Sequence, residues 1–507
     1  MNIIEKLHNK TLEFVKNNDY ENAVINYNKI LDNIDNMKKK YLYELLNIYK
    51  TTNNHKEALV KCYLPLKLLM PNDYILINEI GICYFNLNQY DIALKYFNKI
   101  KVSTNLSDVY NNVGICYAKL KDYKNAEENF IYSNKMNNNY TSNLSLGEIY
   151  YYEKKYTKSI QYYNNIKNET TNNMNNKSYN SSFPYLANRQ FLKGFELYEY
   201  RLMKNEINIQ SGQKDRIEIP YLKYWNGIDK CTRLLIVYEQ GIGDNIQFFR
   251  FIYELSEKYP YLKIDYFGRD VVNHLFIETE NVKLIKTVMF FDNYNKMVYD
   301  HYIYIMSLPY VLKIKTISPN NLQYIKLSED KLVEWKLKVD KLKKYKVGIV
   351  FNGLLSCFIE KNIPLTEFKQ LCDLDIELIC VHKKSDIDSE LKNISFMDKL
   401  HLYDLDTQVP FEDTIHLLKN IDLLITVDTS IVHLAGVLGV KTWLLLGYSE
   451  WRWSNIESTT YWYDSVELIR TTKDEKELKN IMPRIKIKLQ QVLDKHYNIS
   501  NNIFIHC

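Results

Sequence analysis

The stretch from Asp422 to Gly447, DLLITVDTSIVHLAGVLGVKTWLLLG, is the clearest indication of the fold in the second half of this chain. Its first apolar run, LLITV, has the length of a strand that is buried on both faces. Thr429 and Ser430 follow, and they predict an N-cap for a short helix that begins at Ile431. A second apolar run, TWLLL, predicts another buried strand. The pattern is that of a strand, a helix and a strand in a parallel sheet.

The turn between the first strand and the helix is a candidate binding site. Open α/β sheets bind ligands at the carboxyl ends of their strands. The free N–H groups and the dipole of a helix N-terminus favour a phosphate. Asp428 and His433 add two polar side chains at the same place. The alternative is an ordinary crossover whose polar residues only cap a helix.

A second stretch of the same kind, RLLIVYEQGIGDN, begins at Arg233. It predicts a buried strand, a tight loop and an amphipathic helix over 245–259. Gly241 and Gly243 let the backbone turn sharply and leave room for a ligand. The loop is not the dinucleotide-binding G-x-G-x-x-G, because Ile246 stands where the third glycine would be needed.

Asp244 stands at the start of this helix, where it can cap the helix, act in catalysis, or do both. Two strand-turn-helix sites so far apart in the chain imply two α/β lobes. We expect the first lobe over 183–335 and the second, with a C-terminal helix, over 336–507. A charged helix over 328–344 is expected to join them.

Five motifs together resemble the repeat-bearing members of glycosyltransferase family 9, relatives of the heptosyltransferases that build bacterial lipopolysaccharide. They are GFELYEYR at 194–201, YWNG at 224–227, EQGIGD at 239–244, VDTSIVHLAGVLG at 427–439 and EWRW at 450–453. The resemblance implies a GT-B fold, in which two Rossmann-like lobes face each other across a cleft. It also implies inverting transfer of a sugar from a nucleotide-diphosphate donor, with neither a cofactor nor a bound metal.

The resemblance assigns roles to single residues. Asp244 matches the acidic residue proposed as the general base in the N-terminal lobe. Asp428 matches the contact to the donor sugar. Thr429, Ser430 and His433 match the turn that holds the diphosphate.

Lys361 lies in the segment KNIP, which resembles the Lys-x-x-Pro of the heptosyltransferases, where the lysine steadies the donor phosphate. The repeat-bearing bacterial members usually have Arg-Ser before Ile-Pro instead. They also usually carry Trp where this chain has Phe351. The sugar and the nucleotide therefore stay open, among hexosyl, heptosyl and N-acetylhexosaminyl donors.

The chemistry of such a transfer agrees with these assignments. An acceptor hydroxyl is a poor nucleophile, so a positioned carboxylate such as Asp244 is useful as a base. The leaving diphosphate gathers negative charge, which a helix N-terminus, Lys361 and His433 can stabilise. Asp428 would repel the diphosphate, so we expect it to face the sugar hydroxyls.

The first third of the chain is an internal repeat. Gly81, Gly114 and Gly147 are spaced by 33 residues, and a tyrosine follows each glycine by three positions. A small residue follows each by twelve positions and an aromatic residue by sixteen. The pattern resembles the tetratricopeptide repeat, and it predicts an α-solenoid of five repeats over 1–168. We expect a concave groove for a protein partner or acceptor peptide; the alternative is a rigid extension of the enzyme. Residues 169–182 are polar and predict an exposed linker.

Composition excludes several classes of protein. The 507 residues leave room for about three domains. The net charge of +5 comes from 66 basic and 61 acidic residues and gives no case for nucleic acid. No apolar run has the length of a membrane span, and the N-terminus lacks a signal-peptide core. The cytoplasm is therefore the expected compartment. No C-x-x-C pair occurs, so neither zinc nor a disulfide framework is expected.

Three Asp-x-Asp triplets occur, and such a triplet holds a metal in the other large glycosyltransferase fold. They begin at Asp373, Asp386 and Asp404. None follows a clear buried strand, so we predict no metal site.

The sequence thus predicts an inverting, metal-independent glycosyltransferase that uses a nucleotide sugar. The acceptor would be a hydroxyl of a glycan or a protein, recruited with the help of the repeats. Repeats followed by a GT-B pair are also the architecture of the O-linked N-acetylglucosamine transferases. The alternative is a repeat scaffold whose transferase domain has lost catalysis.

Overall fold

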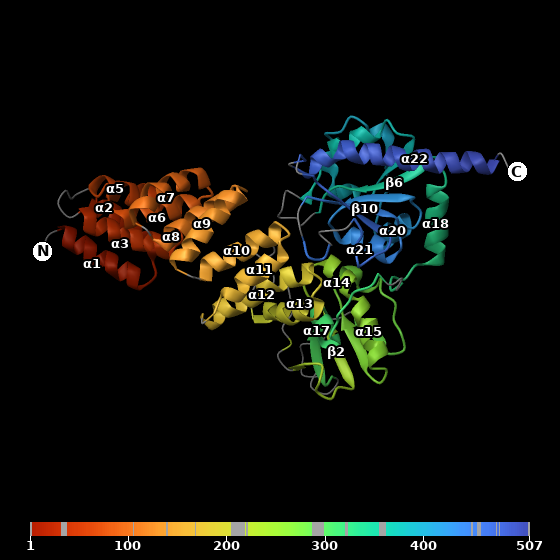
Figure 1. The fold of residues 1–507 in the computed structure, drawn as a ribbon, viewed down its shortest axis with the longest axis horizontal. Coiled ribbons are helices and arrows are strands. Elements are labelled where there is room, and N and C mark those ends of the chain that lie inside the picture. Colours follow the sequence, from red (N-terminus) through yellow and green to blue (C-terminus); the bar gives the residue numbers. More distant parts are fainter. Residues whose placement is uncertain are drawn as a thin grey trace. The chain divides into compact units, whose positions relative to one another are not determined.

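The protein forms two compact units, Met1–Lys177 and Ser178–Cys507 (Figure 1). The computed structural model describes residues 3–31, 38–104, 106–137, 140–167, 169–203, 219, 222–285, 299–319, 323–353, 361–447, 450–453, 458–472, 474–475 and 477–504.

The first unit consists of helices that follow one another in pairs, as the repeat pattern predicts. Each pair is joined by a tight turn with one residue in the left-handed region: Asn18, Asn53, Asn88, Lys121 and Lys154. The pairs are α1 (Ile3–Lys16) with α2 (Tyr20–Leu31), α3 (Lys38–Thr51) with the continuous run α4 (His55–Glu57), η1 (Ala58–Tyr63) and α5 (Leu64–Leu69), α6 (Tyr74–Asn86) with α7 (Tyr90–Thr104), α8 (Ser107–Lys119) with α9 (Tyr123–Met136), and α10 (Tyr140–Tyr152) with α11 (Tyr156–Asn165).

The repeated glycines make close contact between the two helices of a pair. A Cβ added to Gly81 would lie 2.5 Å from the Phe97 ring, and one on Gly114 would lie 2.7 Å from the Phe130 ring. Real Cβ atoms do not approach a ring this closely, so a larger residue requires the ring or the helix to shift. The spacing of small and aromatic residues therefore follows from helix packing.

The segment predicted as an exposed linker, 169–182, is helical instead, so that prediction was wrong. Helix α12 (Thr171–Ala187) runs through it, and α13 (Phe191–Tyr198) follows. The polar composition misled the prediction because serine hydroxyls can be buried when they donate to carbonyls of their own helix. The hydroxyls of Ser181 and Ser182 do this, to the carbonyls of Ser178 at 2.8 Å and Tyr179 at 2.6 Å.

Helices α12 and α13 continue the register of the repeats. Their turn residue, Arg189, also has a positive φ and follows Lys154 by 35 positions. Ser182, Gly194 and Tyr198 stand 35 positions after the glycine, small residue and aromatic residue of the fifth repeat. The chain thus contains a sixth helix pair of the same pattern, and the boundary between the two units falls inside α12.

The second unit contains two parallel sheets, which confirms the two predicted α/β lobes. The first has the order β1-β5-β2-β3-β4 and the second the order β11-β10-β9-β6-β7-β8. The strands are β1 (Lys223–Tyr224), β2 (Arg233–Val237), β3 (Lys263–Phe267), β4 (Val282–Ile285), β5 (His301–Tyr304), β6 (Tyr345–Val350), β7 (Ile376–Cys380), β8 (Leu400–Leu402), β9 (Leu423–Val427), β10 (Thr442–Leu446) and β11 (Val466–Arg470).

Helices flank both sheets, and their bounds differ from expectation in three places. The helix predicted over 245–259 is two helices, α14 and α15. The helix predicted over 328–344 is α18, which already ends at Val339, and α21 begins at Ser430, one residue before the predicted start. Helix ends are the least certain part of any sequence argument. The helices are α14 (Ile242–Phe248), α15 (Arg250–Lys258), α16 (Asp270–Asn273), α17 (Leu308–Leu312), α18 (Glu329–Val339), α19 (Asp388–Leu391), α20 (Glu412–Leu418), α21 (Ser430–Val437) and α22 (Met482–Phe504).

One apolar core connects the two sheets of this unit. It combines Leu234 and Ile236 of β2 with Leu424 of β9, all of them fully buried. Trp451 and Trp462 add aromatic contacts to Phe248 of α14, with ring centroids 6.5 and 5.7 Å apart. This packing holds α14 and the segment around Trp451 together. Across the described residues, no helix is both long and apolar enough to cross a membrane.

Candidate active site

The two strand-turn-helix stretches singled out from the sequence meet in the structure. Helix α14 follows β2, α21 follows β9, and the two helices pack side by side (Figure 1). A Cβ added to Gly243 would lie 2.8 Å from Cδ2 of His433 and 3.5 Å from Cα of Ser430. Gly243 therefore lets α21 approach, whereas the sequence argument had assigned this space to a ligand.

Asp244 both caps α14 and forms an ion pair. Its Oδ2 accepts a hydrogen bond from the backbone N–H of Gly241 at 3.0 Å. Its Oδ1 lies 2.6 Å from Nη2 of Arg452, and both side chains are mostly buried. The two interpretations of Asp244 are thus compatible, because the cap fixes the position of its carboxylate.

Arg452 is a site residue that the sequence argument did not single out, although it belongs to the EWRW motif. Its Nη1 lies 2.7 Å from Oε1 of Glu450, and its Nη2 is also 3.4 Å from Oε1 of Gln240. The guanidinium is therefore held between two carboxylates, Asp244 and Glu450. Burial raises the pKa of Glu450 above its ordinary value, against the opposing effect of Arg452.

Lys361 and Asp428, predicted to contact the donor phosphate and the donor sugar, contact each other. Nζ of Lys361 lies 3.2 Å from Oδ2 of Asp428. Asp428 follows β9 directly and Lys361 lies beyond the end of β6, so neighbouring strands place both residues. The structure brings the pair together beyond the carboxyl ends of the strands of the second sheet.

His433 is buried at the centre of these charges. Its Nδ1 is 3.0 Å from the hydroxyl of Tyr463, and its ring stacks on Trp453 with centroids 5.2 Å apart. Burial lowers the pKa of His433 to about 4. The imidazole is therefore neutral at pH 7 and offers a hydrogen bond instead of a charge.

The same pKa shows how closely the charged residues surround His433. Asp428 and Asp244 raise it, whereas Arg452 and Lys361 lower it. Residues from both sheets therefore act on a single imidazole. The sequence argument predicted four of these five residues and missed Arg452.

The N-terminus of α21 is built as the sequence predicts. Thr429 is the N-cap, and its Oγ1 accepts a hydrogen bond from the N–H of Ile431 at 3.3 Å. Ser430 is the first helical residue and is half-buried. Polar groups of both residues thus lie at a helix start beside Asp428.

The Asp-x-Asp triplets have structural partners. Both carboxylate oxygens of Asp406 accept hydrogen bonds from Thr414, at 2.6 and 3.1 Å. Asp373 pairs with Lys486 at 2.8 Å. No group of three or more potential metal ligands occurs in the part of the chain that the structure describes.

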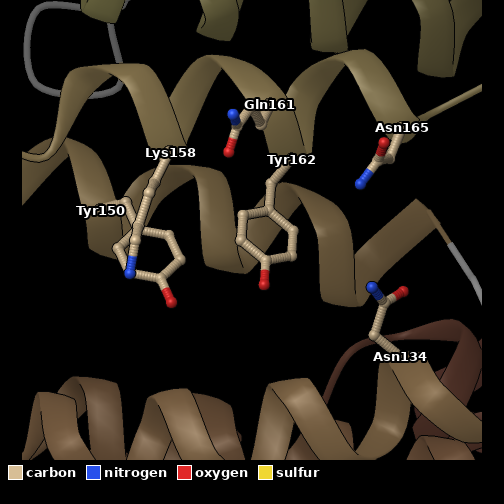
Figure 2. A pocket seen from close by; sticks show the side chains of 6 residues that line it. All are labelled: Asn134, Tyr150, Lys158, Gln161, Tyr162 and Asn165. Atoms are coloured by element: carbon tan, nitrogen blue, oxygen red, sulfur yellow. The ribbon is translucent and has the colours of Figure 1, made fainter.

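A hollow lies in the first unit, among α9, α10 and α11, with a volume of about 350 Å³. Figure 2 shows its polar lining: Asn134, Tyr150, Lys158, Gln161, Tyr162 and Asn165. The rings of Tyr150 and Tyr162 stack with centroids 5.3 Å apart. Nζ of Lys158 is 5.1 Å from the centre of the Tyr150 ring. This hollow is the candidate site at which the repeats would bind a partner.

Comparison with known proteins identifies one of the repeats directly. A family model described as tetratricopeptide repeat matches residues 107–139, which hold the α8–α9 pair. A tetratricopeptide repeat protein from Parabacteroides merdae is similar over 40% of this chain and 80% of its own, at 17% identity and a TM-score of 0.34. No curated protein matches the sequence.

One solved structure is similar to a larger part of the chain. It is the ADP-heptose lipopolysaccharide heptosyltransferase II of E. coli, which matches over 52% of this chain and 99% of its own. The identity is 14% and the TM-score is 0.41.

Proposed function

We propose that this protein is an inverting glycosyltransferase of the GT-B type, with a nucleotide-diphosphate sugar as donor. One observation carries the proposal. Gly243, which precedes Asp244 in the first turn of α14 after the first sheet's β2, packs against Ser430 and His433 at the start of α21, after the second sheet's β9. A base from one lobe and an anion site from the other is the division of labour that such a transfer needs.

In this proposal Asp244 removes the proton of the acceptor hydroxyl while the hydroxyl oxygen bonds to the anomeric carbon. The bond from that carbon to the diphosphate breaks on the opposite face, and its electron pair leaves with the diphosphate. The N-terminus of α21, Lys361 and the neutral His433 stabilise the leaving group by charge and hydrogen bonds. Asp428 accepts hydrogen bonds from the sugar. No step requires a metal.

The acceptor in this proposal is a hydroxyl of a glycan or a protein. The repeats recruit the acceptor or a protein partner, and the hollow around Tyr150 and Tyr162 is the candidate contact. Its amide and lysine side chains suit a polar ligand.

A second candidate function is a repeat scaffold with a non-catalytic transferase domain. The charge pairs favour it, since Asp244 with Arg452 and Asp428 with Lys361 already neutralise each other. A scaffold would keep these pairs for stability alone.

The experiment is a thermal-shift screen of UDP-, ADP- and GDP-sugars in the presence of EDTA, followed by transfer assays with the best ligand. A ligand that binds only the folded state raises the unfolding midpoint. Asp244→Asn is expected to keep nucleotide binding and to lose about a hundredfold to ten-thousandfold in transfer rate. The matched control is Asp404→Asn, because Asp404 is an exposed carboxylate away from the site. Nucleotide-sugar binding with no transfer to any acceptor would favour the scaffold.

A further inference from the structure

We propose that Arg452 is a positioning residue that makes the base available only after the donor has bound. It holds Asp244 in the empty site, and the diphosphate of the donor draws it away. This inference rests on the proposed function, because it assumes that a nucleoside diphosphate binds at α21.

The first argument is the engagement of the Asp244 carboxylate. One oxygen accepts from the N–H of Gly241 at 3.0 Å, and the other lies 2.6 Å from Nη2 of Arg452. An acceptor hydroxyl that is to give its proton to Asp244 must displace one of these partners. The Gly241 bond belongs to the cap of α14, so the Arg452 contact is the one that can be exchanged.

The second argument is the charge balance of the site. The described side chains contribute three carboxylates, on Asp244, Asp428 and Glu450, and two cations, on Lys361 and Arg452. Both cations are already paired. A diphosphate brings further negative charge, so it binds well only if a cation changes partner.

The third argument is the bonding capacity of Arg452. Its Nη1 and Nη2 contact Glu450, Asp244 and Gln240, whereas its buried Nε has no hydrogen-bond partner within the described residues. A guanidinium binds two oxygens of a phosphate side by side. A phosphate that takes Nε and Nη2 would satisfy the unpaired group and release Asp244 in the same movement.

The neighbouring His433 indicates that the diphosphate lies within reach. A Cβ on Gly243, next to Asp244, would lie 2.8 Å from the His433 ring, and Arg452 acts electrostatically on that ring. His433 belongs to the first turn of α21, whose N-terminus is the expected phosphate site. Arg452 therefore lies close to the expected phosphate site.

The test measures the affinity of the full-length protein for UDP, ADP and GDP by calorimetry, with the matching nucleosides as controls. Four proteins are compared: wild type, Asp244→Asn, Arg452→Gln and the double variant. Asp244→Asn is expected to bind the best diphosphate about tenfold more tightly than wild type. The reason is that the diphosphate no longer competes with the Asp244 carboxylate for Arg452. The double variant is expected to bind about tenfold more weakly than wild type. Nucleosides, which lack phosphate, should bind all four proteins alike.

The outcomes separate the two proposals. Equal affinity of wild type and the double variant for the diphosphate would mean that Arg452 stays with Asp244, and the inference would fall while the proposed function stands. If no diphosphate binds either wild type or Asp244→Asn, both proposals fall.

Arg452→Lys covers the case in which the glutamine variant does not fold. It keeps the charge but cannot bind two oxygens side by side. We expect it to bind the diphosphate at least threefold more weakly than wild type, with unchanged nucleoside affinity. Wild-type affinity for the diphosphate in this variant would contradict the role of the guanidinium.

Discussion

Replacing the buried imidazole of His433 should remove a defined part of the protein's acid sensitivity. Burial lowers the pKa of His433 to about 4 in the folded protein, whereas in the unfolded chain it returns to the ordinary value of 6.5. Between pH 6.5 and pH 4 the imidazole is mostly protonated in the unfolded chain and mostly neutral in the folded protein. Stability is therefore lost as the pH falls from 6.5 towards 4, and the loss levels off below the folded pKa.

The size of this effect follows from the two pKa values. One unit of pKa difference corresponds to about 1.4 kcal/mol, so the full effect is about 3 kcal/mol below pH 4. At pH 5 the unfolded imidazole is almost fully protonated and the folded one is mostly neutral. The stability lost between pH 7 and pH 5 is then about 2 kcal/mol.

The assay compares wild type with His433→Gln by urea unfolding at pH 7 and pH 5. All six tryptophans lie between Trp225 and Trp462, so their fluorescence reports on the second unit alone. The variant should be less stable than wild type at pH 7. Because glutamine does not titrate, the stability that the variant loses on acidification should be about 2 kcal/mol smaller than in wild type.

His382→Gln is the matched comparison. Burial also lowers the pKa of His382 to about 4, and its Nε2 accepts from the N–H of Phe351 at 3.1 Å. The same reduction in acid sensitivity is expected. If wild type and His433→Gln lose equal stability between pH 7 and pH 5, the argument for a neutral, buried His433 is refuted.

Two further predictions concern the first unit and its boundary. Gly114→Ala should cost about 1–3 kcal/mol of stability by overpacking, because the new methyl would lie 2.7 Å from the Phe130 ring. Far-UV circular dichroism during urea unfolding measures the loss of stability. Adding Phe130→Leu to this variant should recover part of the loss. A fragment that starts at Glu169 should fold, whereas one that starts at Ser182 should be markedly less stable. The shorter fragment lacks the first eleven residues of α12. Among them is Tyr179, whose ring centroid lies 5.7 Å from that of Tyr198. Equal tryptophan-fluorescence unfolding midpoints for the two fragments would show that the start of α12 contributes nothing to the second unit.

The sixth helix pair shows both the strength and the limit of sequence patterns. Its small and aromatic residues, Ser182, Gly194 and Tyr198, stand in the register of the earlier repeats and could have been recognised. The polar run before them concealed it, because composition does not show that a serine hydroxyl can bond to its own helix. Register was the better guide, since it follows from helix packing.

Local and periodic features of this protein can be predicted from its sequence. A run such as LLITV before Thr429 and Ser430 predicts a buried strand and a capped helix, because burial and capping act between near neighbours in the chain. The repeat of Gly81, Gly114 and Gly147 predicts helix pairs for the same reason. The candidate residues Asp244, Asp428 and His433 were found because each belongs to such a local motif, whereas Lys361 was found only through the resemblance of its segment to a known family.

The interactions between these residues depend on how distant parts of the chain pack together. Arg452 is 208 positions from Asp244, and no local pattern indicates that the two form an ion pair at 2.6 Å. The neutrality of His433 likewise depends on burial between α14, Trp453 and Tyr463. Ion pairs and desolvation depend on distance in space and on exclusion of water, and both are set when distant segments pack together.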